Sequence, residues 1–218
     1  MTASVKSFFN KFFGESGWVK ENVPAAPYFV AAGNPVAANA PSYDDERPKA
    51  LNMFAGENTG FIVVGTSMVP KGILNDDAIA CEKIDEDERM DISAHKFVVV
   101  KVDKEWYKEN RQLATFDYKL RYVLGYVPVN SDFDTFYKDI SKKEDSVLVP
   151  SNKRELKRKY EEAVKYYGAE TPLILSLTFK EGITHYSVHP VRLVEYEVVE
   201  LGRLQSDGSW IKTELPAA

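Results

Sequence analysis

The feature that most limits the fold of this chain is a series of short runs of β-branched and aromatic residues beyond about residue 50. Turn-forming residues separate these runs, and residues of these types favour strands. The runs are Phe61–Val64, Ala78–Cys81, Phe97–Val102, Phe116–Val127 and Val191–Leu201. The pattern therefore predicts one mostly β domain over residues 50–218, with largely antiparallel strands. Because no apolar run approaches the roughly 20 residues of a membrane span, membrane enzymes are excluded.

One segment has a helical period instead. Ser151 or Asn152 can cap its start and Gly168 can end it. One face between them is apolar and the other is densely charged, which is typical of a helix with a solvated outer side. We therefore expect a helix over about 151–167, inserted into the β domain within residues 141–172.

Residues 1–49 differ from the rest in composition. Five prolines lie between Glu21 and Lys49, interleaved with alanine, glycine and asparagine. Proline removes backbone donors and fixes φ, so this region is predicted to be an extended, mobile N-terminal arm. Within it, the stretch from Tyr28 to Gly33 is apolar enough to lie along a protein surface.

Charge and cysteine content narrow the function classes. Twenty-eight basic against 33 acidic residues give a formal charge of −5, which disfavours direct nucleic-acid binding. A single cysteine, Cys81, excludes an internal disulfide and fits a cytoplasmic protein. His185 and His189 are four residues apart but lie in an expected strand or loop, so neither a metal site nor a cofactor is predicted.

Ser67 is the strongest candidate for chemistry. It lies in a glycine-containing turn directly after the run Phe61–Val64, where a hydroxyl can stand at a sheet edge beside free backbone N–H groups. A serine hydroxyl needs a base to take its proton. Because the three histidines lie in no motif, the available base is a lysine, which burial can make neutral.

Three landmarks resemble the LexA/UmuD family of self-cleaving serine–lysine (S24-type) proteins. The stretch Gly65–Asp77, GTSMVPKGILNDD, resembles the family signature G-x-S-M-x-x-x-G-I-x-x-G-D, with Asp76 where the family prefers glycine. Upstream, VAAGNP resembles the family's Ala-Gly cleavage site, which implies cutting between Ala32 and Gly33 at about the family's spacing from Ser67. The stretch Val127–Phe133, VPVNSDF, is similar to a third family motif.

The resemblance implies a LexA/signal-peptidase-like β domain and a Ser-Lys dyad of Ser67 with a lysine on a β-hairpin. The family pattern D-x-E-Φ-T-Φ-K, where Φ is a hydrophobic residue, reaches Lys108 after one deletion, whereas a gapless match places Glu109 there. We prefer Lys108 as the base. Lys119, which has better alternating flanks, and Lys104 stay open as alternatives.

The part of the chain up to Ala32 is too short for the DNA-binding domain of a LexA-type repressor, so the layout resembles UmuD. This implies a homodimer whose self-cleavage, stimulated by a RecA–single-stranded DNA filament in the SOS response, lets it serve an error-prone Y-family polymerase. The alternative is a catalytically inactive interaction module of phage or plasmid type. A signal peptidase shares the chemistry, but no membrane anchor is expected here.

Overall fold

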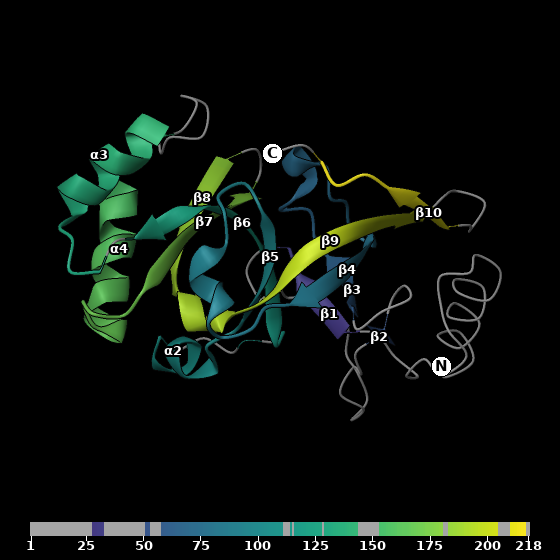
Figure 1. Cartoon of the computed structure of the whole chain (residues 1–218), viewed down its shortest axis with the longest axis horizontal. Coiled ribbons are helices and arrows are strands. Elements are labelled where there is room, and N and C mark those ends of the chain that lie inside the picture. Colours follow the sequence, from purple (N-terminus) through teal and green to yellow (C-terminus); the bar gives the residue numbers. More distant parts are fainter. Residues whose placement is uncertain are drawn as a thin grey trace.

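The computed structural model describes residues 28–32, 51–52, 58–110, 114, 116–127, 129–143, 153–180, 183–204 and 210–216. These residues are mostly β, as expected, and their ten strands join in one sheet (Figure 1). Three α-helices lie toward one end of the sheet: α2 (Lys104–Glu109), α3 (Phe133–Lys143) and α4 (Lys153–Tyr167). Three short 3-10 turns complete the described chain: η1 (Val69–Lys71), η2 (Glu88–Asp91) and η3 (Val191–Leu193).

Six of the strands close into a barrel. In sheet order each is paired with the next, and the last pairs with the first. The ring consists of β1 (Tyr28–Ala31), β3 (Thr59–Val64), β4 (Ala78–Lys83), β9 (Val194–Leu204), β5 (Phe97–Lys101) and β6 (Tyr118–Val127). Closure removes the free edges that β3 and β6 would otherwise present.

Strand β1 closes this ring by pairing in parallel on both sides. Val30 is the register partner of Val63 on β3 and of Tyr118 on β6. Val30, Ala31 and Ala32 are all buried. The expectation of a mobile arm through residue 49 is therefore wrong for Tyr28–Ala31, because two backbone ladders hold this apolar stretch inside the β domain. The rest of residues 1–49 lies outside the described chain.

The main apolar core fills the barrel interior and continues across β7 and β8 to the inner faces of α3 and α4. Alternate side chains from the ring strands point inward, and the fully buried ones include Val30, Phe61, Leu120 and Tyr122. The opposite face of β5 and β6 packs on a smaller apolar cluster that includes Val98, Val100 and Val123. A strand buried on both faces accounts for the nearly continuous apolar runs in the sequence.

The remaining strands extend the barrel. The hairpin of β7 (Leu173–Lys180) and β8 (Ile183–Pro190) continues from β6, and α4 packs against β8. Short strands β2 (Leu51–Asn52) and β10 (Trp210–Thr213) pair with β3 and β9. None of the helices in the described chain is long and apolar enough to cross a membrane.

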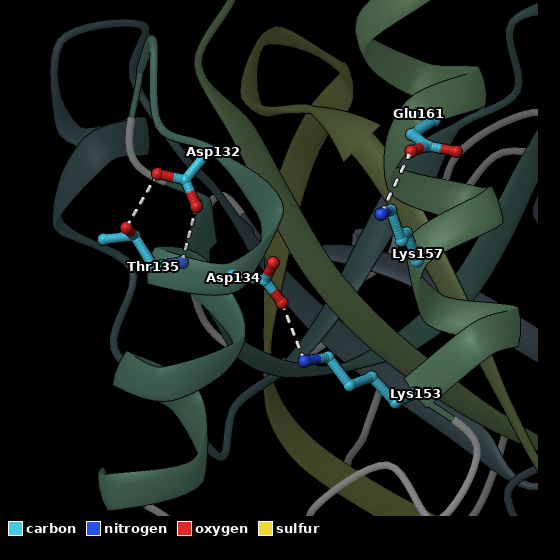
Figure 2. Close-up of polar contacts among 6 residues, drawn as sticks. All are labelled: Asp132, Asp134, Thr135, Lys153, Lys157 and Glu161. Atoms are coloured by element: carbon cyan, nitrogen blue, oxygen red, sulfur yellow. Dashed lines mark hydrogen bonds and ion pairs between the residues drawn. The ribbon is translucent and has the colours of Figure 1, made fainter.

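The predicted helix is present as α4, whereas α3 was not predicted. Asp132 begins α3, since its carboxylate accepts hydrogen bonds from the Thr135 backbone N–H at 2.8 Å and hydroxyl at 2.9 Å (Figure 2). The Lys153 ammonium on α4 lies 2.7 Å from the Asp134 carboxylate on α3. Two helices therefore pack together where an insertion with one helix was expected.

Replacing Val30 with aspartate tests whether β1 is part of the barrel. Val30→Asp would place a carboxylate at a fully buried position, so we expect the free energy of unfolding to fall by about 3 kcal/mol. Hydrogen exchange should then show that the amides of residues 28–32 are protected in the wild type and lose protection in the variant. Val129→Asp is the matched control because Val129 is 45% exposed, and its effect should stay within about 0.5 kcal/mol. Fast exchange of residues 28–32 in the wild type would contradict this role of β1.

Candidate active site

Ser67 lies in a tight turn at the end of β3. Gly65 has a φ of 102°, a conformation that favours glycine, and its N–H donates to the Asn75 side-chain oxygen at 2.7 Å. The Val69 N–H donates to the Thr66 carbonyl at 3.1 Å, which closes the turn around Ser67. The strand therefore stops abruptly, and the partly exposed Ser67 stands at its end.

An ion pair between a buried carboxylate and a partly exposed guanidinium fixes the loop that follows this turn. The Asp77 carboxylate is 2% exposed and accepts from the Arg203 guanidinium on β9 at 3.1 and 3.0 Å and from the Leu74 N–H at 2.7 Å. The same guanidinium donates to the Gly72 carbonyl at 2.6 Å. Asp76 has a φ of 66°, which explains why the family pattern favours glycine at this position. The signature residues after Ser67 thus act as its scaffold.

The backbone around Ser67 provides donors of the kind an oxyanion requires. The Ser67 carbonyl accepts from the Phe179 N–H on β7 at 2.9 Å, and the Met68 side chain is fully buried, which holds the backbone in place. None of the described residues accepts a hydrogen bond from the N–H of Ser67 or of Met68. Such fixed N–H groups can stabilise a developing negative charge.

The predicted cleavage segment ends beside this turn. Ala31 is the register partner of Val64 on β3 and of Lys119 on β6. The Ala32 N–H donates to the Val64 carbonyl at 2.8 Å, so the pairing continues up to the residue before the predicted cleavage bond. Gly33 lies outside the described residues.

Lys108, the preferred base, is not brought to this site. The segment expected to form a hairpin strand is the helix α2, which begins where the Asp103 carboxylate accepts from the Trp106 N–H at 3.0 Å. Lys108 and Glu109 are both exposed on this helix. Lys104 is also exposed and pairs with Asp117.

Lys119 has the properties that a lysine base requires. It is 5% exposed, and it lies on β6 directly opposite Ala31. Burial, together with the positive charge of Arg121, lowers the pKa of Lys119 well below its ordinary value. Of the three lysines considered, the structure places only this one beside the cleavage segment.

The Lys119 ammonium has a partner that sequence analysis missed. Its Nζ lies 3.3 Å from Nδ1 of His189 on β8, a histidine that is 6% exposed. Burial and the neighbouring charge of Lys119 lower the pKa of His189 well below its ordinary value. Among the described residues, no hydrogen bond joins Lys119 to Ser67. The strands β1, β3 and β6 are therefore paired as cleavage would require, but the Lys119 Nζ contacts His189 and not Ser67.

The sequence gives one indication that Lys119 and Arg121 lie together, but none for His189. Lys119 and Arg121 are two residues apart in an apolar strand, and such spacing places both side chains on one face. His189 comes from a distant strand, which no local pattern links to β6. Within the described chain, no group of three or more histidine, cysteine or acidic residues could hold a metal ion.

This chain matches no protein-family model, no curated protein and no solved structure.

The buried ammonium of Lys119 yields a stability prediction. Lys119→Met should raise the free energy of unfolding near pH 7 by about 1–4 kcal/mol, because it removes a charge that burial disfavours. The folded-state pKa of Lys119 lies below its ordinary 10.5, so between these values the unfolded chain binds more protons and wild-type stability rises with pH. The advantage of the variant should therefore shrink as the pH approaches 10.5.

Urea unfolding across this pH range measures both effects. Lys108→Met is the matched control, since Lys108 is exposed, and it should change the stability by no more than about 0.5 kcal/mol. A large loss of stability in Lys119→Met that does not depend on pH would contradict a disfavoured buried charge.

Proposed function

We propose that this chain is a LexA/UmuD-like serine–lysine protein that cleaves itself between Ala32 and Gly33. The observation that carries the proposal is the position of β1, which lies in parallel between β3, leading to Ser67, and β6, carrying Lys119. A protease commonly holds its substrate as an added strand, and here a segment of the chain itself occupies that place. Holding the bond beside the nucleophile replaces a bimolecular encounter.

The proposed reaction uses a neutral lysine as the base. The Ser67 hydroxyl attacks the Ala32 carbonyl while the lysine takes its proton, and the N–H groups of Ser67 and Met68 stabilise the oxyanion. The lysine then protonates the Gly33 nitrogen, which leaves with the C-terminal part of the chain. A water molecule, deprotonated by the same lysine, hydrolyses the acyl-serine and regenerates Ser67.

Lys119 replaces Lys108 as the proposed base. Its burial and lowered pKa support this role, whereas Lys108 is exposed on α2. In the proposed active arrangement, the Lys119 Nζ exchanges its contact with His189 for one with Ser67. A RecA–single-stranded DNA filament would act by favouring that arrangement and would add no catalytic group.

The wider role is proposed from the sequence resemblance. The product of cleavage would be a LexA/signal-peptidase-like β domain, acting as a homodimer with an error-prone Y-family polymerase in the SOS response. One observation favours the alternative of an inactive interaction module: the Lys119 ammonium contacts His189 and not Ser67. The cleavage experiment separates these two functions.

Alkaline incubation of the purified chain tests the reaction. We expect the wild type to be cut between Ala32 and Gly33 and Ser67→Ala and Lys119→Ala to be cut at least about 100-fold more slowly, since each change removes a group that reacts. Lys108→Ala, a lysine-to-alanine change on the exposed helix, should be cut at the wild-type rate. Mass spectrometry identifies the fragments.

Loss of cutting in Lys108→Ala, with normal cutting in Lys119→Ala, would restore Lys108 as the base. A wild type that is never cut, with or without RecA filaments, would favour the interaction module. Circular dichroism of each variant shows whether the fold is retained.

The cleavage rate should depend on pH through the base. Because only neutral Lys119 accepts the serine proton, the rate should rise with pH and level off above the Lys119 pKa. That pKa lies well below 10.5, so the plateau should begin below the pH expected for an exposed lysine. Arg121→Gln should move the profile to higher pH, because the positive charge of Arg121 lowers the Lys119 pKa. Single-turnover rates from pH 6 to 11 measure this shift, and an unchanged profile would contradict it.

A further inference from the structure

A small cavity beside Lys119, on the far side of this lysine from the barrel interior, supplies no reacting group other than Lys119 to the reaction above. Its volume is about 100 Å³, and it lies between α2, α4 and the strands β6 and β8. Lys119, Arg121 and His189 line it and are buried. Asp103, Trp106, Tyr107, Lys159, Glu162 and Tyr167 are among the residues that complete the lining.

The buried charged and polar side chains of this cavity are cationic or can donate hydrogen bonds. Asp77, the one buried acid in the described chain, pairs with Arg203 in the scaffold of the Ser67 turn. Burial lowers the pKa of Arg121 to about 10. Two cations buried together are costly unless an anion accompanies them or a proton leaves.

His189 adds a donor directed by its contact with Lys119. When the Lys119 ammonium donates to Nδ1, the neutral imidazole carries its proton on Nε2. This Nε2 is buried and has no hydrogen-bond partner among the described residues. A buried N–H without an acceptor, in a cavity lined by two cations, indicates a ligand that brings acceptor oxygens.

The acidic groups of the cavity are engaged or exposed. The Asp103 carboxylate caps α2, and its charge raises the Lys119 pKa less than burial and Arg121 lower it. The Glu162 side chain, 42% exposed, pairs with Arg158 and Lys159 on α4. Tyr107 and Tyr167 stay neutral, since burial raises the pKa of both. A ligand in this cavity would therefore contact the buried side chains of Lys119, Arg121 and His189.

We propose that this cavity binds a phosphate group, held by Lys119, Arg121 and His189. A guanidinium and an ammonium are strong partners for phosphate oxygens, and the volume suits one small oxyanion. The group could be free phosphate or the phosphate of a mononucleotide, because Trp106 and Tyr107 offer aromatic surface in the same cavity. In both cases the same three side chains would bind the phosphate oxygens.

Binding here would also regulate self-cleavage, a consequence that rests on the proposed function. A phosphate beside Lys119 would stabilise its ammonium form, and a protonated lysine cannot take the proton of Ser67. Phosphate would therefore slow cleavage near neutral pH.

Titration calorimetry with inorganic phosphate tests the site, using the full chain as Ser67→Ala so that cleavage does not interfere. We expect binding to weaken about tenfold or more in Arg121→Gln and to be retained in large part in Arg121→Lys. Arg158→Gln is the matched control: it makes the same change on the outer face of α4 and should bind within about twofold of the parent.

Thermal melting shows whether Arg121→Gln folds, and phosphate should raise the melting temperature of Ser67→Ala but not of this variant. Absence of binding, or equal weakening by Arg121→Gln and Arg158→Gln, would overturn the site. Adenosine monophosphate binding at least about tenfold more tightly than phosphate would assign the nucleotide source, and equal affinity would assign the free ion.

Cleavage of the wild type in phosphate and in chloride, at one pH and ionic strength, tests the regulation. We expect slower cutting in phosphate. An equal rate, when calorimetry shows saturation, would overturn the regulatory role. A chain that binds phosphate but is never cut would refute the proposed function and leave the binding site supported.

Discussion

The two-sided pairing of β1 is the constraint on which the rest of this structure depends. By pairing in parallel with β3 and β6, β1 closes a six-stranded barrel and places Ala31 opposite Lys119. The same pairing brings the chain toward the turn that carries Ser67. If the bond after Ala32 is cut, the strand that closes the barrel belongs to the released fragment. Cleavage would then allow the edges of β3 and β6 to become available for other contacts.

Two groups of charged side chains beside this barrel differ in sign: one pairs opposite charges, and the other places like charges together. The Asp77 carboxylate and Arg203 guanidinium neutralise each other and fix the loop after Ser67, so that the proposed nucleophile has a rigid support. Lys119 and Arg121 have like charges and are buried beside His189, an arrangement that burial penalises. A lysine base requires such an environment, because a lysine stabilised by a carboxylate would keep its proton at neutral pH. The stability cost expected from burying Lys119 therefore accompanies its proposed role as the base.

Much of the fold could be predicted because its signals are local. Short β-branched runs predicted the strands that became β3, β4, β5, β6 and β9, and an amphipathic period predicted α4. Two errors show where local signals stop. Prolines around Tyr28–Ala31 predicted a mobile arm, but strand pairing with β3 and β6 outweighed them. The segment after Val102 was expected to form a hairpin strand, but Asp103 caps a short helix there.

The sequence by itself determined the β-rich class and the tight turn around Ser67, because each depends on neighbouring residues and on backbone preferences. The candidate cleavage bond came from a short local motif through its resemblance to a family pattern. The sequence left three lysines open as the base. The tertiary structure shows that their environments differ, because the pKa of a lysine depends on its burial and on charges brought from elsewhere in the chain. Lys104 and Lys108 are exposed on α2, whereas β1 and β8 enclose Lys119 on a strand of the barrel. The cluster of Lys119, Arg121 and His189 likewise exists only through folding, since β6 and β8 are distant in sequence.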